Sequence, residues 1–391
     1  MPSRPFDVPR RTLLKAGLFS PLAAAVGLPS PGAEASRAEG PVPLREKFFG
    51  CIAGCHIGSS MGAPVEGWPH ERIEKEHGTL DRLLPYEHYG NGWRREPGTT
   101  EDGVERQKLM ITAIIEKKDR VTAEDVKAAW VKHIKPESAG KVSEPFEATL
   151  LALAKAGIPA VDIGRYCDYA GLVSMARSCH PLGLINAGDV PGAIADVHEV
   201  GQLYQTARSR GLRWASMTAA AIASATKPGA TVESVLDDLH EHGDPAVLGE
   251  VDRGLKLTEG CKNFRDLRRA FDKVYSGAGV PYAFSYANEV VTKALCIFRM
   301  TRGNLRDTIV AGVNMGRDTD CVTAVSSGIA GALCGGGSLP PEWIDAVDRA
   351  TKHNPYTNSQ RTLREHSDGL HRAFQARIER MKAYAEEMGR A

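Results

Sequence analysis

Helical periodicity, repeated almost without a break from residue 44 onward, is the feature that most constrains this chain. In VERQKLMITAIIEK the apolar residues return at three- and four-residue intervals, as they do along one face of an α-helix. Thr122 stands directly before the next periodic segment, AEDVKAAWVKHI, and is a typical N-cap. Alternating β-branched runs are scarce, so the sequence predicts an all-α fold. Further helices are expected at 144–156, 189–206, 212–226, 231–241, 284–301, 304–314 and 321–334.

Small residues indicate how these helices pack. The chain has 40 glycines, and they fall inside helical patterns and at helix ends rather than in low-complexity tracts. Gly50, Gly54 and Gly58 recur in the first predicted helix, where they allow another helix to approach closely. We expect one compact helical domain at 44–360. The C-terminal amphipathic helix at 361–391 is expected to lie on this domain; a partner-binding arm is the alternative.

The N-terminus has the pattern of an export signal. Arg10 and Arg11 precede a short apolar run, and AEA at 33–35 offers the small residues that signal peptidase requires. This order predicts a twin-arginine signal peptide over residues 1–35, followed by a linker at 36–43. The protein is then expected to be exported to the periplasm or out of the cell. A disordered basic N-terminus is the alternative.

The charge balance argues against nucleic acid as a partner. The chain carries 49 basic and 48 acidic side chains, and residues 1–35 hold four of the basic and two of the acidic ones. The mature chain therefore keeps 45 basic and 46 acidic side chains, a formal charge of −1. This balance provides no excess of positive charge for binding phosphates. No later apolar run approaches the ~20 residues needed to cross a bilayer, so no membrane span is expected.

The cysteine pattern argues against a domain stabilised by zinc or by many disulfide bonds. The chain has eight cysteines and no CxxC pair, so neither a zinc ribbon nor a dense disulfide framework is predicted. Cys51 and Cys55 lie four residues apart on one predicted helix face and are expected in the core; a redox-active role is the alternative. The sequence does not indicate an oligomeric state.

Two acidic clusters stand directly before predicted helices. The first, TTED at 99–102, has the ordinary composition of an N-cap and favours that role when taken alone. Asp318 and Asp320 are harder to explain as a cap, because a helix needs one cap and a second carboxylate adds repulsion. Two aspartates at this spacing can bind one hard cation such as Mg²⁺, Ca²⁺ or Mn²⁺. Both a cap and a metal-binding loop remain open for this turn.

Three motifs, in a fixed order, resemble those of the ADP-ribosylglycohydrolase family. SSMGAPVE, which ends at Glu66, is similar to the family's first motif, G-D-A-L-G-x-P-x-E. TEDG at 100–103 is similar to its second motif, T-D-D-T. GRDTDCVTAVSSGIAGALCG at 316–335 is similar to its last motif, G-G-D-T-D-T, followed by a helix of small residues. The resemblance runs from about residue 48 to 340.

Two further segments extend the resemblance. Residues 195–225 are similar to a family segment in which a histidine and a later G-x-x-Y precede an alanine-rich helix; these correspond to His198 and Tyr204. The segment 174–189 contains Arg177 and His180 and is predicted to be loop-like. Here Met175-Ala176-Arg177 stands where the family has an adjacent Met-Arg.

The resemblance implies an orthogonal all-α helical bundle whose central cleft holds two Mg²⁺ ions, or Mn²⁺ in their place. The ions would orient ribose hydroxyls and a water molecule that attacks the anomeric carbon. The implied metal ligands are Thr100, Glu101, Asp102, Asp318 and Asp320, with Cys321 at a further ligand position. The implied catalytic residues are Glu66, Asp102 and Asp318, and the implied substrate-binding residues are Glu66, Arg177, His180, His198 and Tyr204.

Four positions depart from the family motifs: Ser59 and Glu101 each replace an aspartate, and Gly103 and Cys321 each replace a threonine. Cys321 removes a hard oxygen from the second ion, which predicts either one tight and one weak ion or a softer metal such as Mn²⁺. The expected activity is metal-dependent hydrolysis of a ribosyl N- or O-glycosidic bond, in an ADP-ribosyl compound or related riboside. The alternatives are a nucleoside hydrolase and an inactive family member that binds a nucleotide or serves structurally.

Overall fold

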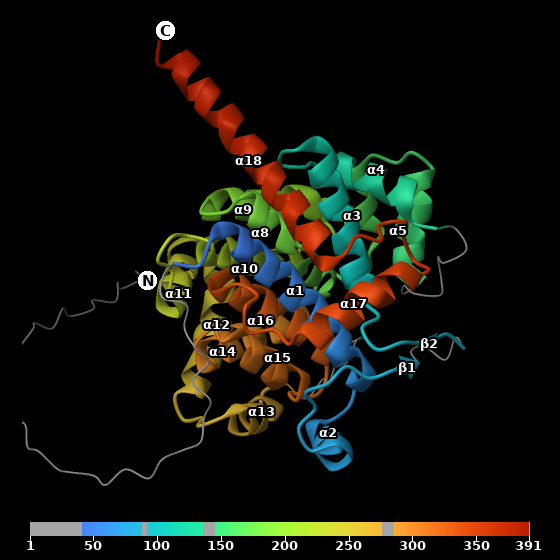
Figure 1. Ribbon diagram of the computed structural model, residues 1–391, viewed down its shortest axis with the longest axis vertical. Coiled ribbons are helices and arrows are strands. Elements are labelled where there is room, and N and C mark those ends of the chain that lie inside the picture. The colour runs from blue at the N-terminus through green and yellow to red at the C-terminus, as the bar shows by residue number, and fades with distance from the viewer. Residues whose placement is uncertain (1–40, 88–91, 136–144, 276–284, 391) are drawn as a thin grey trace, which may run out of the picture. The chain divides into compact units, whose positions relative to one another are not determined.

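The fold is built from α-helices, which confirms the all-α prediction. The computed structural model describes residues 41–87, 92–135, 145–275 and 285–390 (Figure 1). The predicted signal peptide at 1–35 and residues 36–40 of the predicted linker lie outside the described residues. The described residues between 41 and 390 form one compact unit. Within the described ranges, no helix is both long enough and apolar enough to cross a membrane.

The elements follow one another with short connections. The helices are α1 (Leu44–Gly62), α2 (His70–His77), α3 (Asp102–Lys117), α4 (Ala123–His133), α5 (Pro145–Lys155), α6 (Ala160–Ile163), α7 (Ser174–Ser178), α8 (His180–Ile185), α9 (Val190–Val200), α10 (Arg210–Ala225), α11 (Val232–His242), α12 (Pro245–Thr258), α13 (Phe264–Asp272), α14 (Ala287–Met300), α15 (Leu305–Val313), α16 (Thr319–Cys334), α17 (Pro341–His353) and α18 (Leu363–Met388). Single 3₁₀ turns are η1 (Ala63–Val65), η3 (Gly164–Tyr166) and η4 (Gly201–Leu203). Two short strands, β1 (Tyr86–Glu87) and β2 (Arg94–Arg95), pair antiparallel.

Several helices begin where the sequence predicts. Thr122 caps α4 by accepting a hydrogen bond from the backbone of Asp125, whose side chain accepts one from the backbone of Thr122. This reciprocal pair satisfies two amides that the first helical turn would leave unpaired. The predicted helix at 321–334 corresponds to α16, which begins two residues earlier at Thr319. That earlier start places Asp320 inside the first turn.

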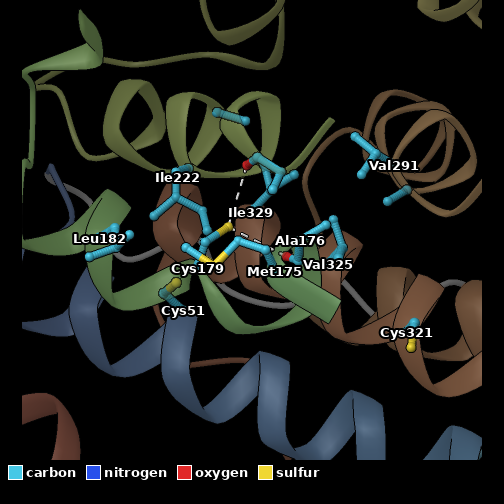
Figure 2. Packing of buried hydrophobic residues seen from close by; sticks show 14 of the residues in the cluster. Cys51, Met175, Ala176, Cys179, Leu182, Ile222, Val291, Cys321, Val325 and Ile329 are labelled. Atoms are coloured by element: carbon cyan, nitrogen blue, oxygen red, sulfur yellow. Dashed lines mark hydrogen bonds between the residues drawn. The ribbon is translucent and has the colours of Figure 1, made fainter. Parts of the chain in front are cut away.

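The loop predicted at 174–189 is wrong, because the structure contains α7 and α8 there. Helices this short have little stability of their own in water, so their formation depends on burial. Figure 2 shows Met175 and Cys179 packed between α1, α10 and α16, with Cys51 and Ile222 nearby. The Cys179 thiol donates to the carbonyl of Ala215 at 3.4 Å. Tertiary packing therefore makes this segment helical, and hydrophobic periodicity within the segment does not predict it.

α1 packs very closely against α16. A Cβ atom added at Gly331 would lie 2.0 Å from the carbonyl oxygen of Gly50, well inside the range of ordinary contact. One turn further along, Ser327 Oγ donates to the carbonyl of Gly54 at 2.7 Å. The two backbones therefore touch directly, as the run of small residues predicts. In Figure 1 the two helices lie side by side at the centre of the bundle.

The long terminal helix α18 is divided into two parts. Its first half packs on α1, α3 and α8 and buries Leu363, Leu370 and Ala373, which agrees with the prediction that it lies on the domain. Residues 381–390 are exposed, and α18 extends past the other helices (Figure 1). All eight cysteines are free, and Cys51 and Cys55 are fully buried as expected.

Candidate functional site

Asp318 and Asp320 lie at the start of α16 without acting as ordinary caps. Asp318 occupies the N-cap position, yet its side chain makes no capping hydrogen bond. None of the described residues donates a hydrogen bond to either carboxylate oxygen of Asp318 or to Oδ1 of Asp320, although all three atoms are buried. Asp189 and Asn304, by contrast, cap α9 and α15 with their side chains. The oxygens of this turn are therefore available to a bound ligand.

A short backbone pairing brings Glu66 beside this turn. The Gly67 amide donates to the Arg317 carbonyl at 2.8 Å, and the Arg317 amide donates to the Trp68 carbonyl at 2.8 Å. Arg317 has a left-handed backbone (φ 66°), which is uncommon for a residue with a side chain. Its guanidinium is held by both carboxylate oxygens of Glu289, at 2.6 and 2.8 Å. This ion pair stabilises the turn that places Glu66 next to Asp318.

Gly62 allows the end of α1 to lie directly on the start of α16. A Cβ atom at this position would lie 2.6 Å from the backbone of Asp320. The Thr319 hydroxyl donates to the Gly62 carbonyl at 2.9 Å and locks the contact. The first and last sequence motifs thus meet because one helix ends in glycine.

The charges at this meeting point repel one another. The ligating atoms of Asp318, Asp320 and Cys321 lie within 4.8 Å of one another. Burial, followed by the charge of Asp320, raises the pKa of Asp318 well above its usual range. Burial and the charges of Asp320 and Glu101 raise the pKa of Glu66 in the same way. A divalent cation would relieve this repulsion and supply the missing partner of the buried oxygens.

Glu101, at the start of α3, is held by protein groups. Its Oε1 accepts a hydrogen bond from the Tyr86 hydroxyl at 2.6 Å. The guanidinium of Arg95 lies 2.6 Å from the same oxygen, and both charged side chains are buried. Neither partner was identified from the sequence. The small hairpin of β1 and β2, which carries them, therefore neutralises one of the predicted metal ligands.

Thr100 and Asp102 also have protein partners. The Thr100 hydroxyl donates to Glu105 at 2.6 Å and accepts from Lys108 at 3.1 Å. Lys108 in turn pairs with Glu105 at 2.7 Å, in a fully buried position. Asp102 accepts a short hydrogen bond from the guanidinium of Arg177. In this structure each acidic side chain of the second motif is thus paired with a basic side chain.

Arg177 links the two acidic clusters. Besides Asp102, its guanidinium lies 3.7 Å from the sulfur of Cys321 and 3.8 Å from Glu147. A Cβ atom on Gly103 would lie 2.4 Å from Cδ of Arg177, so the missing side chain makes room for the arginine. Arg177 and Glu66 are partly exposed, while the aspartates are buried. A substrate would therefore meet Glu66 and Arg177 first.

His180 lies behind the site, with no exposed surface. Its Nδ1 lies 3.0 Å from Nε2 of Gln107, and its Nε2 lies 3.1 Å from the Ala324 carbonyl. A carbonyl can only accept, so Nε2 carries the proton and Nδ1 accepts from the amide. Burial lowers the pKa of His180 to about 4. Gln107 also pairs with His56 of α1 at 2.9 Å, so the network ties α1, α3, α8 and α16 together.

His198 lies apart from the acidic cluster, and Tyr204 lies behind it. His198 lines a polar pocket of about 680 Å³ together with Arg208 and Asp244, and none of the clustered carboxylates lines that pocket. Tyr204 is buried and meets Trp130 edge to face at 5.0 Å. The structure therefore joins Glu66, Asp102, Arg177, Asp318, Asp320 and Cys321 in one region. Tyr204 lies behind Arg177, near Glu147, and His198 lines a separate pocket.

Sequence reasoning missed some residues that support the site. Gln107 and Lys108 belong to a run of polar residues, ERQK, which by composition predicts exposed surface, yet both are buried. Only their position within an otherwise apolar helix could have indicated burial. Arg95 could have been suspected from the arginine pair just before the TTED cluster, since buried acids require cations.

A model of the ADP-ribosylglycohydrolase family matches residues 41–380. The chain belongs to this family. The match extends well into α18, beyond the segment 48–340 in which motifs are similar. The similarity to the ADP-ribosylglycohydrolase family is thus longer than the motifs, and the motifs are the segments that meet at one place in the fold.

Similar proteins cover most of the chain. An uncharacterized protein of Archaeoglobus fulgidus is 23% identical over 319 residues, which are 78% of this chain and 92% of that protein. The uncharacterized protein YegU of Escherichia coli K12 is 23% identical over 323 residues, 78% of this chain and 93% of its own length. A solved structure titled an ADP-ribosylglycohydrolase-related protein complex matches with a TM-score of 0.59 at 19% identity, over 85% of this chain and 97% of that one. At this identity the structural match shows the fold.

Proposed function

We propose that the protein is an exported, metal-dependent glycohydrolase that cleaves a ribosyl N- or O-glycosidic bond. ADP-ribosyl compounds and related ribosides are the proposed substrates. The observation that carries the proposal is that three buried oxygens, both carboxylate oxygens of Asp318 and Oδ1 of Asp320, have no donor among the described residues. Oxygen ligands of this kind suit Mg²⁺ or Mn²⁺. Membership in a family of glycohydrolases supports the reaction class.

Each residue of the cluster has a defined task in this proposal. Asp318 and Asp320 would hold the cation, which supplies Lewis-acid chemistry at the ribose when bound. Glu66 is the partly exposed carboxylate beside them, so it can position a ribose hydroxyl or exchange a proton with the reacting group. Arg177 pairs with Asp102 and, like Glu66, is partly exposed. Burial of Asp318 and Asp320 would keep bulk water away from the carboxylates that hold the cation.

The activity is tested by a screen of ribosides. Purified protein is incubated with nucleosides, ADP-ribosyl compounds and simple ribosides in Mg²⁺, Mn²⁺ or EDTA, and released reducing sugar is measured. We expect release that requires metal and is lost in Asp318→Asn. Asp307→Asn, an exposed first-turn aspartate of α15, is the matched control and should keep activity. If metal binds but no riboside is cleaved, a binding role replaces the enzymatic one.

Export is tested separately. Arg10→Lys with Arg11→Lys in the full chain should leave the protein inside the cell, because the twin-arginine route reads the arginine pair. Fractionation followed by immunoblotting measures the location. Equal export of the variant and the unchanged chain would refute the twin-arginine assignment while leaving the activity open.

A further inference from the structure

The two halves of the acidic site differ in charge compensation. At the start of α3, Glu101 pairs with Arg95 and Asp102 pairs with Arg177. At the start of α16, both oxygens of Asp318 and Oδ1 of Asp320 are buried and receive no hydrogen bond from any described residue, while Oδ2 of Asp320 accepts one from the Cys321 thiol at 3.6 Å. The sequence motifs treat both halves as metal ligands. Because the acids at α3 already have cationic partners, the contacts favour a metal cation at α16.

Arg177 lies where the two halves face one another. Its guanidinium bonds Asp102 on α3 and lies 3.7 Å from the sulfur of Cys321 on α16. Both residues belong to positions implied to ligate metal. Arginine keeps its positive charge at every pH a protein meets, so a fixed cation already stands between two predicted ligands.

Two departures from the family motifs fit this position. The threonine expected at 103 would place a Cβ atom 2.4 Å from Cδ of Arg177, whereas Gly103 leaves that space open. The threonine expected at 321 would bring a hard oxygen, whereas Cys321 brings a soft sulfur that Mg²⁺ does not favour. The change at 103 removes a side chain that would clash with Arg177, and the change at 321 removes an oxygen ligand that a second ion would need.

We propose that the Arg177 guanidinium takes the place of the second divalent ion, so that the chain binds a single ion on Asp318 and Asp320. This inference rests on the proposed metal-dependent function. It assigns Arg177 a fixed positive charge at the active site and makes Asp102 its partner instead of a metal ligand. Arg177 is then a positioning residue, and its side chain keeps a small exposed surface.

Metal stoichiometry tests the inference without an activity assay. Metal-stripped full-length protein is dialysed against Mn²⁺, and bound Mn²⁺ per chain is measured by elemental analysis, with electron paramagnetic resonance to detect coupled pairs. We expect a single uncoupled ion in the unchanged protein and loss of that ion in Asp318→Asn. A coupled pair of ions in the unchanged protein would overturn the inference and leave the proposed function standing. Absence of any bound ion would instead refute metal dependence itself.

Variants separate Arg177 from Cys321. Cys321→Thr alone should still bind a single ion, because Arg177 remains in place, whereas a second ion in this variant would show that the cysteine was the obstacle. Arg177→Ala combined with Cys321→Thr should bind a second ion. Arg177→Lys keeps the charge and should stay at a single ion. Circular dichroism confirms folding of each variant, and Cys321→Thr decides the question if the Arg177 variants do not fold.

Discussion

Gly331→Ala should destabilise the protein by forcing α1 and α16 apart. The new Cβ atom would lie 2.0 Å from the Gly50 carbonyl oxygen, whereas ordinary contact begins at 3.4 Å, so the backbones must separate by about 1.4 Å. Overpacking of this kind costs about 1–3 kcal/mol. Separation also weakens the hydrogen bond from Ser327 to the Gly54 carbonyl, which is worth about 1 kcal/mol. The better helix propensity of alanine returns about 1 kcal/mol.

The expected net loss in the free energy of unfolding is about 1–3 kcal/mol. Gly249→Ala is the matched control, because Gly249 is an exposed residue of helix α12 and an added Cβ atom meets nothing within 4 Å. It gains propensity without a clash and should raise stability by about 0.5–1 kcal/mol. Urea unfolding followed by circular dichroism measures both variants. An unfolding midpoint for Gly331→Ala equal to or above that of the unchanged protein would refute the close approach of the two helices.

Three further outcomes follow from buried charges. In EDTA, Asp318→Asn should unfold at a higher temperature than the unchanged protein, because it removes a buried charge without a donor; saturating Mg²⁺ at 100 times its Kd should stabilise only the unchanged protein, by about 2.7 kcal/mol. Lys108→Met should cost about 3–5 kcal/mol in urea unfolding, because it leaves Glu105 buried without its cation, and a loss below that of an exposed Lys→Met control would contradict the pairing. The His180 ring should stay neutral until the pH falls to about 4, because burial lowers its pKa. Its contribution to the free energy of unfolding is therefore fully present above the unfolded pKa of about 6.5 and is lost as the pH falls toward 4. A ring that titrates near pH 6.5 by NMR would contradict its burial.

The sequence predicts the long helices well because their signals are local. Thr122 with Asp125 forms a capping box within four residues, and the terminal helix predicted at 361–391 is α18, Leu363–Met388. The short helices α7 and α8 carry no such signal, since burial between α1, α10 and α16 forms them. Hydrophobic periodicity describes one helix at a time, so it cannot predict α7 and α8, which depend on packing against α1, α10 and α16.

The candidate site was predictable in part for a similar reason. Motif order and spacing brought Glu66, Asp318 and Asp320 together, and the structure places them side by side. The partners that neutralise the second cluster, above all Arg95 and Lys108, were not predictable, because each reaches its acid through tertiary packing or lies in a polar run. The spacing of the motifs predicts which carboxylates meet, whereas nothing in the local sequence predicts the basic side chains that pair with them.

The contrast between the two acidic clusters bears on whether catalysis was retained. A site that had become purely structural could lower its free energy by pairing or losing buried charge, because an unpaired buried carboxylate is costly. The α3 cluster shows such pairing through Arg95, Lys108 and Arg177. Asp318 is fully buried and has no donor among the described residues, so folding carries its cost whenever no cation is bound. Binding a cation offsets that cost, and this favours an ion-binding, catalytic role over a structural one.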